Sequence, residues 1–468
     1  MTERPYYLLP FDFTELSGKE VLVNELGDMI ISPKGTVQKI VDGTLPKDEI
    51  YKSLVSNFFL SEQIIPPLAE VYAERLREKK RFLESWTGLH IFVLTLRCNQ
   101  NCVYCQASSQ NEESNGCTMN RETMARGVDL MFHSPSSSIT MEFQGGEPSL
   151  VPDLIEYGIQ LAEERNKDAK KEIHYVLCTN SIHLTDHMLD ICKKYGVVIS
   201  TSLDGPAFLH NANRGKKDSY ENVVAGIAKG REAVGCDKVS ALMTTSVEGL
   251  NYPVEIVDEY VKLGFRAMFL RALNPYGLAT HNDDWSDYTN RFIAFYKKAL
   301  EHIIELNKQG TYFVEEFAAI ILRKMLTPYC TGFVDLQSPA GVINSVLIYN
   351  YDGGVYCSDE SRMLAEFNDY TFKLGSVNDR YEDLVFGKKA KEIANIWANE
   401  ALAGCSDCAL KQYCGADPVR NYSTQGDMYG NRATSLLCRK NKAIIEYLIS
   451  LIIERHDEVM PIFRSWVA

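Results

Sequence analysis

The chain has 468 residues, of which 45% are hydrophobic, 24% charged and 10% aromatic, an ordinary globular composition that excludes a disordered or fibrous chain. Its 49 Lys and Arg residues stand against 62 Asp and Glu residues, and a net charge of −13 argues against nucleic-acid binding, which needs clustered cations. No apolar run reaches the roughly 20 residues of a membrane-spanning helix, and the N-terminus lacks a signal-peptide pattern. We therefore expect a cytoplasmic protein with no membrane partner.

The N-terminal region of the chain predicts a small module of short elements. Strands are expected at 21–23 and 29–31, helices at 34–41 and 46–57, and a solvated linker helix at 74–81. This order of elements predicts a winged-helix-like module over residues 1–85.

Alternating strands and helices follow the module. Strands are expected at 91–96, 139–143, 173–178, 197–203, 239–244 and 265–270, with helices that include 184–195, 220–233 and 288–306. Because strands alternating with helices form parallel sheets, residues 86–310 predict an α/β fold. Six units instead of eight predict an open, partial (β/α)6 barrel, with its active site at the carboxyl ends of the strands.

Residues 311–468 are less regular and predict a third domain. A hairpin is expected at 346–356, where Asp352-Gly353-Gly354 makes the turn. A group of cysteines and a C-terminal helix come after it.

Three cysteines directly follow the first barrel strand: Cys98, Cys102 and Cys105, here called the first cysteine group. Three thiolates on one loop can hold three irons of a 4Fe–4S cluster and leave the fourth iron open. The alternatives are a zinc site, for which His90 and Cys117 are the nearest further ligands, or simple packing.

Small and polar residues also cluster where the next strands end. Paired glycines allow close approach of a ligand to the backbone, and carboxylate and guanidinium groups bind charged ligands. The residues concerned are Tyr104 beside the last cysteine, then Gly145, Gly146, Glu147, Pro148, Thr179, Asn180, Ser202, Asp204 and Arg214.

This combination, over about residues 89–306, resembles the radical S-adenosylmethionine (radical SAM) superfamily. The resemblance implies that the first cysteine group holds a 4Fe–4S cluster whose open iron binds S-adenosylmethionine. It also implies that Glu147, in the Gly145–Pro148 motif, contacts the amino group of S-adenosylmethionine. The other polar and glycine residues named with it would line the pocket for S-adenosylmethionine.

A second cysteine group consists of Cys405, Cys408, Cys414 and Cys438. Its spacing suits either zinc or an iron–sulfur cluster. Behind a radical SAM barrel it resembles a SPASM domain, which implies that these four cysteines bind one auxiliary 4Fe–4S cluster.

Two positions depart from the full SPASM pattern. Ser338 and Pro418 stand where further cysteine ligands are expected, and proline offers no donor atom. We therefore predict that a second auxiliary cluster is lost or altered. Cys357 and Cys330 remain as candidate ligands or hydrogen donors, while the catalytic residues themselves stay unassigned.

The module at residues 1–85 resembles elements that recognise the leaders of ribosomally made peptides, and the whole chain is most similar to the maturases of the His-Xaa-Ser peptide system. The resemblance implies an enzyme that uses a 5′-deoxyadenosyl radical to modify, and we expect crosslink, a precursor peptide. A sulfatase-maturating type of protein oxidase and a peptide epimerase are the alternatives. An external flavodoxin- or ferredoxin-type electron donor is also implied.

Overall fold

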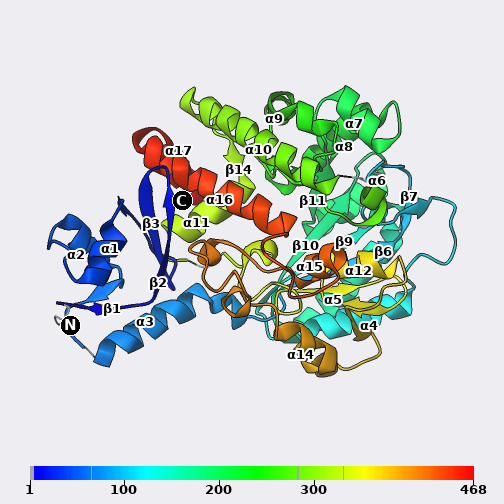
Figure 1. The fold of residues 1–468 in the computed structure, drawn as a ribbon. Helices are drawn as coiled ribbons and strands as arrows, with labels where there is room; N and C mark the ends of the chain where they lie inside the picture. Colours follow the sequence, from blue (N-terminus) through cyan, green and yellow to red (C-terminus); the bar gives the residue numbers. More distant parts are fainter. Residues whose placement is uncertain (1–4, 65, 282–283, 330) are drawn as a thin grey trace.

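The computed structural model describes residues 5–64, 66–281, 284–329 and 331–468. Figure 1 places a small N-terminal module at one side of the molecule and a larger α/β body at the other. The C-terminal helices α16 (Leu436–Glu454) and α17 (His456–Val467) run across the body close to the module.

The N-terminal module contains a three-stranded antiparallel sheet in the order β2-β3-β4. Its elements are β1 (Tyr7–Leu8), β2 (Phe11–Leu16), β3 (Lys19–Asn24), β4 (Met29–Pro33), α1 (Thr36–Asp42), α2 (Glu49–Ser56), β5 (Leu60–Ser61) and α3 (Pro66–Lys79). The two predicted strands are confirmed, and β2 is added to them. Sequence reasoning missed β2 because no residue of this edge strand is fully buried, so its apolar pattern is weak.

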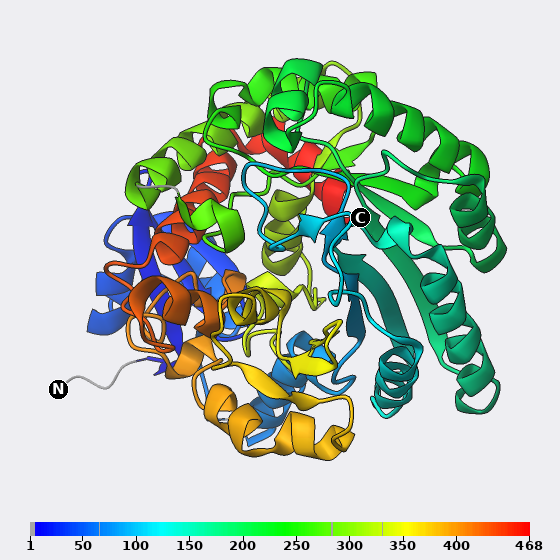
Figure 2. The same ribbon diagram turned by 90° about the vertical axis from the view of Figure 1, so that its right-hand side faces the viewer.

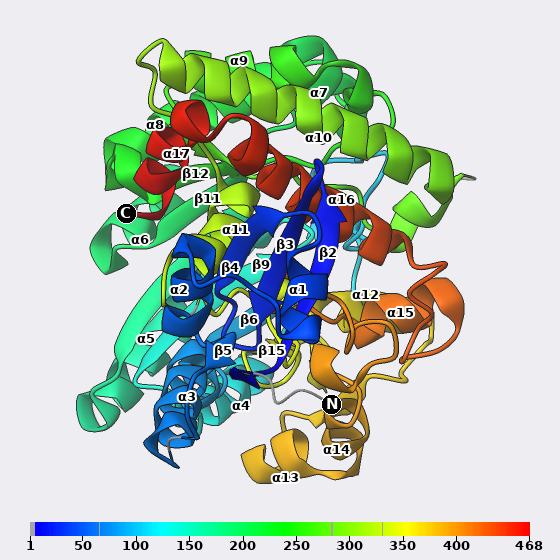
Figure 3. The ribbon, with the colours of Figure 1, turned by 60° about the vertical axis from the view of Figure 1, so that its left-hand side comes forward.

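The module is fastened to the body by its sheet. Val21 and Val23 of β3 belong to the main hydrophobic core, whereas Leu22 and Ile30 face a separate core inside the module. At the β2–β3 turn, the Ser17 hydroxyl donates a hydrogen bond of 2.5 Å to Glu454 of α16. Figure 3 shows the sheet of the module beside α16.

The body is built on parallel strands with helices outside them, as Figure 2 shows. The elements are β6 (Leu89–Thr95), α4 (Arg121–Phe132), β9 (Ser138–Gly145), α5 (Pro152–Ala169), β10 (Glu172–Thr179), α6 (Asp186–Tyr195), β11 (Val198–Ser202), α7 (Ala207–Arg214), α8 (Ser219–Val234), β12 (Val239–Leu242), α9 (Pro253–Lys262), β13 (Ala267–Met268) and α10 (Trp285–Lys308). The predicted α/β class with a parallel sheet is thus confirmed.

The sixth predicted strand, β13, is shorter than expected. It pairs with β14 (Val314–Glu315) in a separate parallel ladder, and an isolated bridge between Thr245 and Ala272 connects this region to the segment after β12. Two residues beyond β13, the Leu270 amide donates to the Glu315 carboxylate at 3.0 Å.

The C-terminal region extends the same sheet. Its elements are α11 (Glu316–Leu326), β15 (Val346–Tyr349), β16 (Gly354–Tyr356), α12 (Asp359–Ala365), β17 (Lys373–Ser376), α13 (Tyr381–Phe386), α14 (Lys388–Ala394) and α15 (Pro418–Gln425), before α16 and α17. The predicted hairpin is confirmed, because β15 and β16 pair antiparallel. β15 also pairs parallel with β6, so the sheet order is β12-β11-β10-β9-β6-β15-β16-β17.

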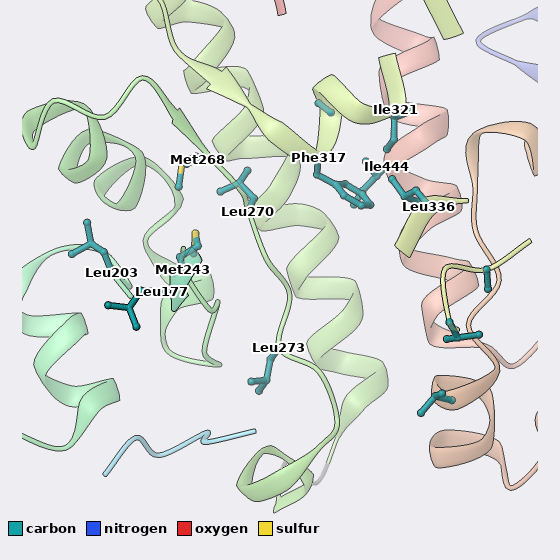
Figure 4. Close-up of a cluster of buried hydrophobic side chains, with 14 of the residues drawn as sticks. Leu177, Leu203, Met243, Met268, Leu270, Leu273, Phe317, Ile321, Leu336 and Ile444 are labelled. Atoms are coloured by element: carbon teal, nitrogen blue, oxygen red, sulfur yellow. The ribbon is translucent and has the colours of Figure 1, made fainter. Parts of the chain in front are cut away.

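A continuous hydrophobic core joins the barrel to the C-terminal helices. Figure 4 shows Leu177, Leu203 and Leu270 from the barrel in the same cluster as Phe317 of α11 and Ile444 of α16. Such shared burial unites the barrel and the C-terminal region in a single packed unit. None of the helices in the described segments of the chain combines the length and apolar character needed to cross a bilayer.

Candidate functional site

The first cysteine group lies on the loop between β6 and α4. Its three thiols line a cavity of about 220 Å³ at the carboxyl ends of the barrel strands. The loop is held by the short strand pair β7 (Arg97–Cys98) and β8 (Gln110–Asn111). Burial raises the pKa of the Cys98 thiol to about 12, and the nearby charge of Glu147 adds to the effect.

The end of β9 packs directly under this loop. The Gly146 amide donates to the Thr95 carbonyl at 2.7 Å, and the Glu147 amide donates to the Arg97 carbonyl at 2.8 Å. A β-carbon on Gly145 would lie 2.1 Å from the Thr95 oxygen, and one on Gly146 would lie 2.4 Å from the Arg97 oxygen. Both positions therefore require glycine, which explains the paired glycines of the motif.

The Glu147 carboxylate is turned away from the cavity. It is fully buried and accepts hydrogen bonds from the Thr179 hydroxyl at 2.7 Å, the Asn180 amide at 2.7 Å and the Ser149 amide at 3.0 Å. Burial raises its pKa, although these hydrogen bonds oppose the shift. In this structure the carboxylate ties the ends of β9 and β10 together, with Pro148 buried beside it.

A buried ion pair forms another wall of the site. Two nitrogens of Arg214 donate to the Asp204 carboxylate at 3.0 and 2.8 Å, and the Tyr104 hydroxyl donates to it at 2.5 Å. Burial opposes the charged form of Asp204, yet the Arg214 guanidinium holds the pKa of that carboxyl below its usual value. The third nitrogen of Arg214 donates to the Cys102 sulfur at 3.8 Å.

Most of the residues singled out from the sequence meet at this one cavity. Besides the three cysteines, its lining includes Tyr104, Gly145, Gly146, Thr179, Asn180, Ser202 and Arg214. The cavity lining does not include Glu147, Pro148 or Asp204, which are buried outside it.

Sequence reasoning missed other lining residues, among them Gln144, Cys178 and Ser200. Each faces the barrel interior from β9, β10 or β11, at a position that alternates with buried apolar side chains. The period of two along each strand was the available signal.

A second, inner cavity of about 320 Å³ adjoins the first. Gln144, Leu242, Arg271 and Asp359 line both cavities. Carboxyl groups also line the inner one, contributed by Glu142, Asp335 and Glu360. Burial raises the pKa of Glu142, and burial together with neighbouring acids raises the pKa of Glu360 to about 8.

The second cysteine group comes together from a loop and the first turn of α16. Burial raises the pKa of the Cys405 thiol to about 11, and the charges of Cys414, Cys438 and Cys408 contribute to that rise, so the four sulfurs lie near one another. The Ser435 hydroxyl caps α16 by accepting from the Cys438 amide at 3.2 Å. In the described ranges of the chain, no three His, Cys, Asp or Glu side chains are arranged to hold a metal ion.

The positions that depart from the SPASM pattern have other partners here. The Ser338 hydroxyl donates to Glu400 at 2.5 Å, and Pro418 is the first residue of α15. Cys357 is fully buried at the end of β16, and burial raises the pKa of its thiol to about 12. Cys330 lies outside the described residues.

Three known proteins illustrate what the chain is similar to. The AdoMet-dependent heme synthase of Methanosarcina barkeri is 26% identical over 362 residues, which cover 71% of this chain and 92% of that protein. The solved structure of anSMEcpe with bound AdoMet and Cp18Cys peptide matches with a TM-score of 0.64 at 17% identity, over 80% of this chain and 99% of that one.

Streptococcus suis SuiB, solved bound to its precursor peptide SuiA, matches with a TM-score of 0.54 at 11% identity, over 93% of this chain and all of that one. At such low identities these structures speak for the fold alone. The family model that matches the chain is that of the radical SAM superfamily, over residues 92–270. This stretch contains the first cysteine group, the glycine pair and the Asp204–Arg214 pair, so residues 92–270 are a radical SAM domain, a family that implies a 4Fe–4S cluster and S-adenosylmethionine.

Proposed function

We propose that this chain is a radical SAM maturase that modifies a ribosomally made precursor peptide. The observation that carries the proposal is the combination of a thiol-lined cavity, an inner cavity beside it and an N-terminal sheet with an open edge. AdoMet and peptide in the anSMEcpe structure, and a precursor peptide on SuiB, support it by likeness of fold.

The donor set of each cysteine group fits a 4Fe–4S cluster. Cys98, Cys102 and Cys105 would hold the first cluster, and the four thiols of the second group would hold an auxiliary one. A 4Fe–4S cluster binds each thiolate through a separate iron, so its ligands need not converge on one point. When both are bound, the first cluster would supply the electron that cleaves S-adenosylmethionine and yields a 5′-deoxyadenosyl radical.

The remaining residues of the first cavity would bind and orient S-adenosylmethionine. Asn180 and Ser202 offer hydrogen bonds from the ends of β10 and β11. Asp204 engages two nitrogens of Arg214, which fixes the guanidinium plane against the cavity. Glu147 would act indirectly, by holding Thr179 and Asn180 in place.

The inner cavity would receive the side chain that is modified. Its volume of about 320 Å³ is enough for one large side chain, and it shares Gln144 and Arg271 with the cavity lined by the cysteines. Carboxyl groups from Glu142, Asp335 and Glu360 would accept hydrogen bonds from that side chain. A bound peptide that closed this cavity to bulk water would protect a radical from side reactions.

The N-terminal module would bind the leader of the peptide by strand addition. In the sheet β2-β3-β4, β4 pairs with β3, and no strand of the described residues pairs with the other edge of β4. An exposed strand edge presents unpaired amides and carbonyls that an extended peptide can use.

Co-expression with a candidate precursor peptide tests the proposal. A mass change on the peptide that requires the first cysteine group, together with 5′-deoxyadenosine formation, is the expected result. Replacement of Ile31 in β4 by proline removes an amide from the edge strand, and it should weaken leader binding while leaving uncoupled cleavage of S-adenosylmethionine intact. Modification of a folded sulfatase in place of a short peptide would instead favour the protein-oxidase alternative.

A further inference from the structure

The second cysteine group has two nitrogen donors on its sulfurs. The Asn441 side-chain amide donates to the Cys414 sulfur at 3.8 Å, and a guanidinium nitrogen of Arg432 donates to the Cys405 sulfur at 3.8 Å. Asn441 lies on α16, one turn beyond Cys438, and is 2% exposed. Asn441 and Arg432 are not among the four cysteines that would bind the cluster, so the cluster assignment alone gives these two residues no role.

Both donors are held in place by close packing. A β-carbon on Gly404 would lie 3.0 Å from the Arg432 Cγ, so the stem of Arg432 rests on that glycine. A second guanidinium nitrogen of Arg432 donates to the Tyr429 carbonyl. Asn441 is fixed by its burial in the first turns of α16. Fixed donors act on a sulfur without first having to be ordered.

The other end of the Asn441 amide faces a small chamber. Its carbonyl oxygen is buried and has no hydrogen-bond partner among the described residues. Asn441 lines a chamber of about 60 Å³, to which Arg271, Asp335 and Glu360 also contribute. The same three residues line the inner cavity, so Asn441 lies between that cavity and the second cysteine group. A buried unpartnered oxygen costs free energy, so its retention calls for a reason.

Hydrogen bonds to cluster sulfurs and nearby positive charge both stabilise the more negative, reduced form of an iron–sulfur cluster. Loss of either contact therefore lowers the reduction potential. We propose that Asn441 and Arg432 are positioning residues that set the reduction potential of the auxiliary cluster. Asn441 also links that cluster to the chamber beside the inner cavity, because it donates to Cys414 and lines the chamber. This inference rests on the proposed function, because it requires a cluster on the second cysteine group.

The test measures the potential of the auxiliary cluster by itself. Replacing all three residues of the first cysteine group by alanine removes the first cluster, and about four irons per chain should remain after anaerobic reconstitution. A redox titration followed by electron paramagnetic resonance then gives the midpoint potential of this protein and of the same protein carrying Asn441→Leu or Arg432→Met.

We expect each substitution to shift the redox equilibrium about tenfold toward the oxidised form, which is ~59 mV lower for one electron. Arg432→Lys, which keeps the charge, should recover some of the shift. Asn350→Leu is the matched control, because Asn350 is a buried amide after β15 that donates to the Asp352 carboxylate and to no sulfur.

Unchanged potentials in both variants, with iron content retained, would overturn the inference while leaving the proposed function standing. Iron near zero in the protein without the first cysteine group would overturn the inference together with the auxiliary-cluster assignment on which it rests. Equal shifts for Asn350→Leu and Asn441→Leu would show that the effect comes from general disturbance of the protein, which also counts against the inference.

Discussion

Replacing Glu147 by glutamine removes one carboxylate oxygen from a fully buried position that accepts three hydrogen bonds. The NH2 group that replaces this oxygen is itself a donor, and it would face the donors that now bind the carboxylate. At least one of these donors therefore loses its acceptor. An unpaired buried donor costs about 1–3 kcal/mol, and removing a buried charge offsets some of this cost. We expect a net loss of about 1–2 kcal/mol, or 5–30-fold in the local opening equilibrium.

Hydrogen–deuterium exchange of the peptides that contain Ser149 and Asn180 measures this opening directly, because both backbone amides donate to Glu147. Exchange at these amides should be about 5–30-fold faster in Glu147→Gln than in the unchanged protein. Glu163→Gln serves as the control, since Glu163 is an exposed residue of α5 that accepts from Tyr175. Unchanged exchange at Ser149 and Asn180, together with loss of S-adenosylmethionine binding, would refute the reasoning and show that the carboxylate serves the ligand directly.

Three further predictions concern the clusters and the module. Alanine at any residue of the first cysteine group should abolish formation of 5′-deoxyadenosine under strong reductant, and near-normal activity in one of them would contradict the ligand assignment. Iron analysis should give about eight irons per chain, about four after a Cys405→Ala/Cys408→Ala double substitution, and no decrease after Cys357→Ala; a value near twelve would show another cluster. Lys411→Met should speed exchange across β3 and β4, because the buried Lys411 ammonium pairs with Asp12 at 2.6 Å and with Glu25 at 2.8 Å; unchanged exchange would mean that apolar packing alone holds the module.

Local signals in the sequence identified much of the site. Cys98, Cys102 and Cys105 are near neighbours in the chain, so their spacing alone places three sulfurs on one loop. The glycine pair could likewise be recognised as two adjacent glycines, although the contacts that require them come from Thr95 and Arg97 on a distant part of the chain. The strand ends carrying Thr179 and Ser202 follow from the alternation of strands and helices.

Other features of the site depend on contacts that local sequence does not encode. Residues as distant as Glu142 and Glu360 line the inner cavity together, which requires the three-dimensional packing of the hairpin region on the barrel. Two of the three donors that hold the Glu147 carboxylate, Thr179 and Asn180, lie more than 30 positions away at the end of β10. Cys178 was missed because a single cysteine in an apolar run is typical of core packing until the strand register is known.

The pairing of β15 with β6 determines where the chain can be truncated without exposing a strand edge. β15 covers the edge of β6 that would otherwise be open, although about 250 positions of chain separate the two strands. A fragment ending at residue 310 would expose the backbone amides and carbonyls of β6, a strand whose side chains are almost all buried. Such an edge invites pairing between molecules and aggregation. The radical SAM domain is thus inseparable in practice from the hairpin that completes its sheet, and functional units of this protein will have to be exchanged or trimmed with that hairpin attached.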